Sequence, residues 1–304
     1  MSPDASQPSS DTPPSPASVA EHPVAWQPLT PVGVAAFATA RGSRLFLLQL
    51  ITAGLTAWVV LWFLGANWFP IIREAIGRLP DQGLIQNQQL SLADALTDPL
   101  AENRFLAFVI DADSVGTPSL ATDLRVEFHR RNAAVCSLFG CLNFDYPPDT
   151  TLQFNRPELE SRWGAWQPMF YWIAGLGVAV WLLISWAVLA TIYCPLVRLY
   201  AFFKDRHLTL VGSWKLCCAA LLPAALAASG CILLYGLGLI DLPQFLIFWS
   251  LHLAVGWVYL ILSPLKLPRA SDARPVTKNP FGDGPAAQAP LPGNSPGASD
   301  GNPS

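Results

Sequence analysis

One pair of cysteines has a spacing that could support chemistry. Cys136 and Cys141, in CSLFGC, are the only cysteines in the polar segment between the first two long apolar blocks. A disulfide, free thiols, a metal site and a redox pair are the open interpretations. His129 is the only imidazole nearby, so a tetrahedral metal set is incomplete. The spacing also differs from the Cys-x-x-Cys of redox pairs.

A pair of carboxylates follows a short apolar run in the same segment. Asp111 and Asp113, in IDADS, could bind a cation or act as two acids. The turn that ends a strand explains them as well, because Asp is common at such positions. We favour the turn and keep both residues as candidate carboxylates of this domain.

His252 lies inside an apolar stretch, residues 245–265. An ionisable group at membrane depth is a functional candidate. A neutral imidazole can also simply donate a hydrogen bond to a neighbouring helix, and no Asp or Glu lies at that depth in the other apolar stretches. We favour the structural role for His252.

Sequence motifs for catalysis or cofactor binding are missing. The chain has no HExxH, no GxSxG, no Gly-rich phosphate loop and no His/Cys metal signature. Its formal net charge of -3 argues against nucleic acid as a partner. We therefore assign no catalytic residue, metal or cofactor.

The composition indicates an integral membrane protein. Hydrophobic residues make up 52% of the 304-residue chain and charged residues only 13%, whereas soluble domains carry about 25% charged residues. The apolar residues form blocks, and a block of roughly 20 can cross a bilayer as a helix. We predict four transmembrane helices with a small α+β extracytoplasmic domain between the first and the second.

The predicted boundaries follow the changes in composition. In chain order they are a disordered tail (1–31), an interfacial helix (32–44), the first span (45–66), the extracytoplasmic domain (67–166), the second span (169–197), a basic loop (198–213), the third span (214–240), the fourth span (245–265) and a second disordered tail (268–304).

The extracytoplasmic domain alternates strand and turn signals. Residues 83–92 predict a hairpin, 104–111 a buried strand, and 124–128 and 151–154 two further strands. Residues 157–166 open with Pro and acids, which predicts a helix start that continues into the second span.

Small residues and prolines indicate how the spans pack. Ala220, Ala224 and Ala228 recur at i, i+4 spacing, and such a ridge lets helices approach closely. It could serve packing within the chain or self-association, and we favour the former. Pro195 and Pro223 should kink or end their helices.

The distribution of Lys and Arg sets the expected orientation. Basic residues gather before the first span, between the second and third, and after the fourth. The positive-inside rule then places both termini in the cytoplasm and residues 67–166 outside. Thiols outside the cytoplasm tend to be oxidised, so we favour a Cys136–Cys141 disulfide.

Several motifs in order resemble an uncharacterised bacterial membrane family. The stretches are PVGVAAFATARGSRLF, LPDQGLIQNQQLSL, RFLAFVIDADS and GSWKLCCAALLPAAL, although Asn87-Gln88 stands where the family usually has Asn-Gly. Some members are labelled maltodextrin-utilisation membrane proteins, and the family is similar to Yip-type multispanning proteins. The resemblance implies a bacterial inner (cytoplasmic) membrane and a multispanning architecture. It implies no activity, because the family has no established one.

Three functions fit these observations. The first is a non-enzymatic scaffold, sensor or accessory subunit that binds a membrane or envelope protein through its outer domain. The second is a transporter of small solutes or lipid, or a subunit of one, and depends on Pro195, Pro223 and His252. The third is a membrane enzyme that acts on lipid or peptide, with Asp111 and Asp113 as acids. We favour the first and expect the lipid bilayer as a partner of the chain in each case.

Overall fold

A computed structural model describes residues 27–92, 99–111, 122–148 and 150–269. The described chain is mostly helical, with a small sheet region, as predicted. Four of its helices are long and apolar enough to cross a membrane. The tails predicted to be disordered lie almost wholly outside the described residues, as does Asp113.

The long helices extend beyond the apolar blocks. α2 (Gly42–Phe63) continues through a π-helical turn, η1 (Leu64–Trp68), into α3 (Phe69–Gly77). The other three are α4 (Arg156–Phe203), α5 (Leu210–Gly236) and α6 (Leu242–Leu262), and a 3₁₀ turn, η2 (Pro264–Lys266), follows α6.

Polar caps mark where two of the long helices begin. The Asn155 side chain accepts a hydrogen bond from Glu158 N–H and starts α4 at Arg156, so the predicted helix that opens at Pro157 and continues into the second span is confirmed. The Thr209 side chain accepts one from Gly212 N–H and starts α5 before residue 214. The basic loop is therefore only residues 204–209. Caps satisfy backbone donors at a helix end, and apolar periodicity does not detect them.

Neither proline ends its helix. α4 continues past Pro195 to Phe203, and α5 continues past Pro223 to Gly236. A proline inside a helix removes one backbone hydrogen bond. Pro223 is buried within the bundle, and packing along α5 holds the helix on both sides of it.

The central element of the bundle is α5. In the most apolar 18-residue stretch of α5, 67% of the residues are buried, whereas the buried share is 11% in the corresponding stretches of α4 and α6. Ala220, Ala224 and Ala228 are all buried. A Cβ atom on Gly256 of α6 would lie 3.4 Å from Ala224 Cβ, so the small residues allow close packing within the chain.

The short helix α1 (Pro31–Ala36) corrects the predicted interfacial helix at residues 32–44. It ends at Ala36, and residues 42–44 already belong to α2. Val34 and Phe37 are fully buried in the cluster that contains α5. The segment therefore packs into the end of the bundle, because its apolar side chains find a protein surface there.

Two sheets form the region between α3 and α4, which we call the sheet domain (residues 83–155). One sheet has the order β2-β1-β8, from β1 (Gly83–Gln86), β2 (Gln89–Leu92) and β8 (Leu152–Gln153). The other has the order β3-β4-β5-β6-β7, from β3 (Ala101–Glu102), β4 (Leu106–Ile110), β5 (Leu124–Phe128), β6 (Asn132–Ser137) and β7 (Gly140–Asp145). Among the described strands, only β4 and β5 pair in parallel. The β6–β7 hairpin was not predicted.

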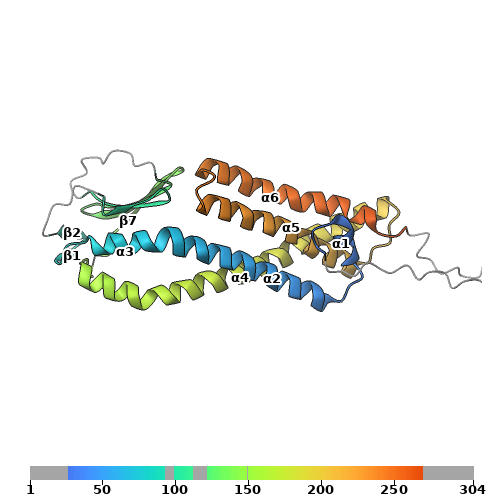
Figure 1. Cartoon of the computed structure of the whole chain (residues 1–304), viewed down its shortest axis with the longest axis horizontal. Coiled ribbons are helices and arrows are strands. Elements are labelled where there is room, and N and C mark those ends of the chain that lie inside the picture. Colours follow the sequence, from blue (N-terminus) through green and yellow to red (C-terminus); the bar gives the residue numbers. More distant parts are fainter. Residues whose placement is uncertain (1–26, 93–98, 112–121, 149, 270–304) are drawn as a thin grey trace, which may run out of the picture.

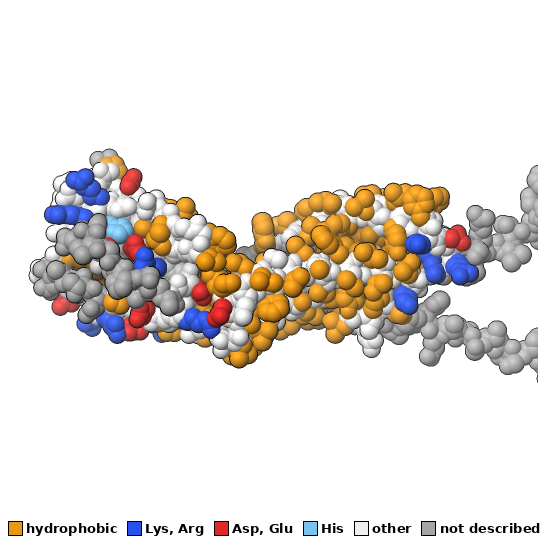
Figure 2. Space-filling view, turned by 90° about the horizontal axis from the view of Figure 1, so that it is seen from above, with side chains coloured by type: hydrophobic (Ala, Val, Ile, Leu, Met, Phe, Trp, Pro, Cys, Tyr) orange, Lys and Arg blue, Asp and Glu red, His pale blue; other side chains and the backbone are white. Residues whose placement is uncertain are grey.

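The sheet domain sits on the helix that projects from the bundle. Ile71 and Ala75 of α3 are buried in one apolar cluster with Ile85, Leu106 and Ile110 of the strands. Figure 1 shows the sheets beside α3 at one end of an elongated molecule, with α1 at the opposite end. In Figure 2 apolar side chains cover the visible face of the bundle between these two ends, and charged groups gather at each end.

Candidate functional site

The sheet domain contacts the α5–α6 turn through Arg104. The Arg104 guanidinium donates to the carbonyl oxygens of Gly238 (2.8 Å) and Ile240 (2.6 Å) and forms an ion pair with Asp241. Three acceptors on one turn thus converge on a single planar donor group, an arrangement that suits arginine. We call this contact, with the aromatic and Asp123 contacts described next, the junction.

A second contact crosses the same boundary. Tyr235, near the end of α5, donates its hydroxyl proton to Asp123 Oδ2 at 2.5 Å. Asp123 N–H in turn donates to the Arg104 carbonyl oxygen at 3.0 Å. The Tyr235 ring lies against the rings of Phe63, Phe105 and Phe245, with centroids 4.8–5.6 Å apart. Elements from both parts of the chain therefore share one aromatic cluster.

Asn103 orients Arg104 by local backbone chemistry. Its side-chain oxygen accepts hydrogen bonds from Phe105 N–H (2.9 Å) and Leu106 N–H (2.8 Å), which fixes the turn before β4. Its amide nitrogen donates to the Asn67 carbonyl oxygen at 2.7 Å, in η1. Arg104 is thus directed at the α5–α6 turn by a turn that is itself anchored to the projecting helix.

The charges of the junction lie partly in solvent. The Arg104 side chain is 34% exposed and that of Asp241 is 71% exposed. At such exposure an ion pair contributes little to stability, about 0–1 kcal/mol. The hydrogen bonds to two carbonyls and the aromatic packing therefore contribute most of the junction's stability.

His252 lines a partly open pocket of about 190 Å³ between the helices, whose rim includes the exposed side chains of Trp181 and Trp257. All four long helices contribute to the wall, with Thr56 from α2, Ser185 from α4, Ala224 and Ala228 from α5, and Trp249 from α6 among the lining residues. His252 Nδ1 is hydrogen-bonded to the Trp249 carbonyl of its own helix, not to a neighbouring helix. Thr56 is also engaged, because its hydroxyl lies 2.8 Å from that of Ser229. The pocket brings His252 close to the alanine ridge.

Asp111 directly follows β4, and the residues of the predicted turn after it, 112–121, lie outside the described chain. The Asp111 N–H donates to the Phe128 carbonyl oxygen at 3.0 Å, and its own carbonyl oxygen lies 3.1 Å from His129 Nδ1. His129 Nε2 lies 3.2 Å from the buried carboxylate of Glu127, which also pairs with Arg125. Within the described ranges no group of three or more His, Cys, Asp or Glu side chains could hold a metal ion.

Tyr146 anchors the strand ends beside this network. Its hydroxyl donates to the His129 carbonyl oxygen at 3.0 Å, and burial raises the pKa of Tyr146 to about 12. The phenol is therefore a neutral donor at physiological pH. Burial of the neutral Tyr146 phenol stabilises the fold fully at pH values below about 10, the ordinary pKa of tyrosine. This stabilisation is lost as the pH rises from there toward 12.

Cys136 and Cys141 form a disulfide. They are directly paired residues of β6 and β7, with Cα atoms 4.0 Å apart. The other cysteines of the described chain, Cys194, Cys217, Cys218 and Cys231, are free and lie in the helices.

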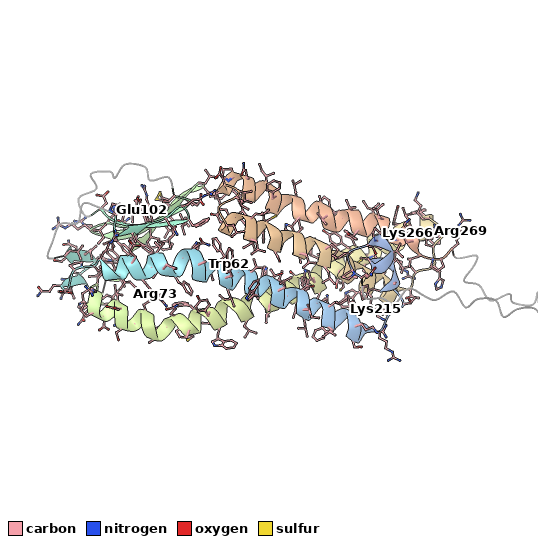
Figure 3. All side chains as sticks on the ribbon, viewed as in Figure 1. Trp62, Arg73, Glu102, Lys215, Lys266 and Arg269 are labelled. Atoms are coloured by element: carbon pink, nitrogen blue, oxygen red, sulfur yellow. A yellow bond between two sulfur atoms is a disulfide. The ribbon has the colours of Figure 1, made fainter. Side chains whose placement is uncertain are left out.

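The opposite end of the bundle is closed by basic residues that donate to backbone carbonyls. Lys215 Nζ donates to the Ala40 carbonyl oxygen at 2.9 Å, and the Arg206 guanidinium donates to that of Leu267. Figure 3 shows Lys215, Lys266 and Arg269 at this end, and Arg73 and Glu102 at the sheet-domain end.

Sequence reasoning missed the junction residues Arg104, Asp123 and Tyr235. The one available signal was Asp241, the only charge in the turn between two apolar blocks. A charge there needs either solvent or a partner, and the sequence does not say which. Comparison with known protein families, curated proteins and solved structures found no match to this chain. The resemblance drawn from the quoted motifs therefore stays a prediction.

Proposed function

We propose that this chain is a multispanning protein of the bacterial inner membrane whose sheet domain lies outside the cytoplasm and acts as a binding module coupled to the bundle. It would serve as a sensor or accessory subunit, not as an enzyme. The junction carries the proposal: Arg104 and Tyr235 join a small domain to a bundle turn more than 100 residues away in sequence. A tether alone would not require such contacts.

The orientation follows from charge and redox chemistry. Lys215, Lys266 and Arg269 gather at the end that holds α1, which supports placing that end in the cytoplasm. The disulfide lies at the other end, and disulfides persist in oxidising compartments.

Alkylation of thiols in intact cells tests the placement. Cells are quenched in acid, denatured and treated with a maleimide mass tag before and after reduction. The four free cysteines should react at once, and Cys136 and Cys141 only after reduction. Six tags without reduction would contradict an extracytoplasmic sheet domain.

Purification from the native membrane in gentle detergent tests the role. We expect a protein partner in stoichiometric amount, retained by the His252→Phe variant. The Arg131→Glu variant reverses a charge at the end of the sheet domain far from the bundle and should weaken binding of the partner. We choose Arg131 because it is exposed and lines a polar notch with Asn87 and Asp145, where a partner could bind the sheet domain. Recovery of the protein alone would count against an accessory subunit.

A transporter or lipid-handling protein is the second candidate, and the pocket beside His252 favours it. It predicts a bound lipid or solute in the purified protein that is lost in His252→Phe and kept in Arg131→Glu. The two variants therefore separate the two functions in one experiment.

A further inference from the structure

The tip of the β6–β7 hairpin displays apolar side chains that nothing in the described chain covers. Leu138 and Phe139 form the turn between the strands, and their side chains are 61% and 81% exposed. Phe139 is the most exposed large apolar side chain of the described residues, just above Trp172 of α4 at 79%. Trp172 lies in the proposed second span, residues 169–197, so Phe139 is as exposed as a side chain that the proposed membrane placement puts against lipid.

The turn has an unusual composition for a hairpin. Tight hairpin turns favour Gly, Asn and Asp, which solvate well and accept unusual backbone angles. Here two bulky apolar residues occupy the turn, and neither has a positive φ. The segment from Asn132 to Phe144 also contains no charged residue. Transfer of this tip from water into an apolar phase therefore costs no charge desolvation.

Strand register places the tip at the end of the sheet that meets the bundle. Ser137, just before the turn, pairs with Leu124, and Leu124 follows the junction residue Asp123. Ser137 also pairs with Gly140, just after the turn. The tip thus projects on the same side as the contacts with the α5–α6 turn, where Figure 1 shows the sheet approaching the helices.

The exposed apolar surface extends from the tip onto β7. Leu142 and Phe144 are 67% and 55% exposed and point to the opposite face from Cys141. The disulfide closes the hairpin directly behind the turn. The disulfide can therefore hold the two apolar side chains of the tip in a fixed position, although the hairpin has no hydrophobic core of its own.

From these observations we infer that the β6–β7 tip inserts Leu138 and Phe139 into the outer leaflet beside the bundle, as a second membrane contact of the sheet domain. The occupant of this surface is phospholipid. The inference rests on the membrane placement proposed above. It explains why apolar residues lie at a turn where water would otherwise surround them.

Photo-crosslinking in membranes tests this contact. Phe139 is replaced by p-benzoylphenylalanine in the full chain, and the purified protein is placed in vesicles of phosphatidylethanolamine and phosphatidylglycerol. After irradiation, intact-mass spectrometry should find a lipid adduct. The same probe at Asp145, at the other end of β7, should give no lipid adduct. The same probe at Leu138 provides a second variant, and retention of the Cys136–Cys141 disulfide verifies the hairpin.

A probe at Trp172 separates failure of the inference from failure of the membrane placement. Lipid adducts at Trp172 but none at Phe139 and Leu138 would overturn the hairpin contact alone. A crosslinked dimer or protein partner at Phe139 would also overturn it and would identify β7 as an edge for strand pairing. Absence of lipid at Trp172 would refute the membrane placement and the inference together.

Discussion

The two ends of the bundle are closed in different ways. At the α1 end, Phe37 is fully buried in the apolar cluster, and Lys215 donates to the Ala40 carbonyl oxygen. At the sheet-domain end, a partly exposed Arg104 and one tyrosine hydroxyl join parts of the chain that are far apart in sequence. The α1 end resembles a protein core, whereas the junction combines a few polar contacts with a single aromatic cluster around Tyr235. A junction of this kind can open at modest cost, as a coupling element must.

The largest expected effect lies at the α1 end. Phe37→Ala removes a fully buried ring and should lower the free energy of unfolding by about 3–5 kcal/mol. Denaturation in detergent, followed by circular dichroism, measures the loss. Val32→Ala is the control in the same segment, because Val32 of α1 is 47% exposed and Phe37 directly follows that helix. Equal losses in both variants would show that α1 is not part of the core.

The next effect lies at the junction. Arg104→Met keeps much of the side-chain volume but removes both hydrogen bonds to the α5–α6 carbonyls, and should cost about 1.5–3 kcal/mol. Hydrogen exchange should rise in residues 237–241 and remain unchanged around α1. Asp241→Asn, which keeps a capping oxygen for α6, should have a smaller effect. A rise in exchange across the whole bundle would contradict a separable junction.

A matched pair of hydroxyl deletions compares the ends directly. Tyr235→Phe removes a hydrogen bond to a carboxylate and should cost about 1.5–3 kcal/mol, whereas Tyr259→Phe removes one to the Leu29 carbonyl and should cost about 0.5–1.5 kcal/mol. Thermal unfolding of both variants in the same detergent provides the measurement. The comparison fails if Tyr259→Phe is the more damaging of the two.

The smallest expected effect is a stabilisation of the β1–β2 turn, which belongs neither to the α1 end of the bundle nor to the junction. Gln88 has φ of +61° in the β1–β2 turn, a left-handed conformation that costs a residue with a side chain about 1–2 kcal/mol. Gln88→Gly should stabilise the sheet domain by about 0.5–1 kcal/mol after the entropy cost of glycine. Gln89→Gly, in β2, should destabilise it instead. Chemical denaturation monitored on the sheet domain distinguishes these signs.

Local patterns explain what was predictable from the sequence. Long apolar runs need a non-aqueous environment whatever their neighbours, so the four membrane-length helices could be predicted from composition. The hairpin at residues 83–92 and the strand ending at Asp111 followed from alternation and turn residues. The start of α4 was predictable because Pro157 and the acidic residues after it are a helix-start signal. The helix α5 begins at Leu210, before the predicted third span, because the Thr209 cap satisfies backbone donors without changing hydropathy.

The sequence by itself determined that the chain has four helices long and apolar enough to cross a membrane, and that a separate polar segment lies between the first two. Only the tertiary structure decided that Arg104 meets Asp241, 137 residues further on, and that α1 is buried against α5. It also revealed the apolar turn of the β6–β7 hairpin. The physical reason is range: hydropathy and turn chemistry act between near neighbours, whereas these contacts depend on where the packed helices and sheets bring distant residues together.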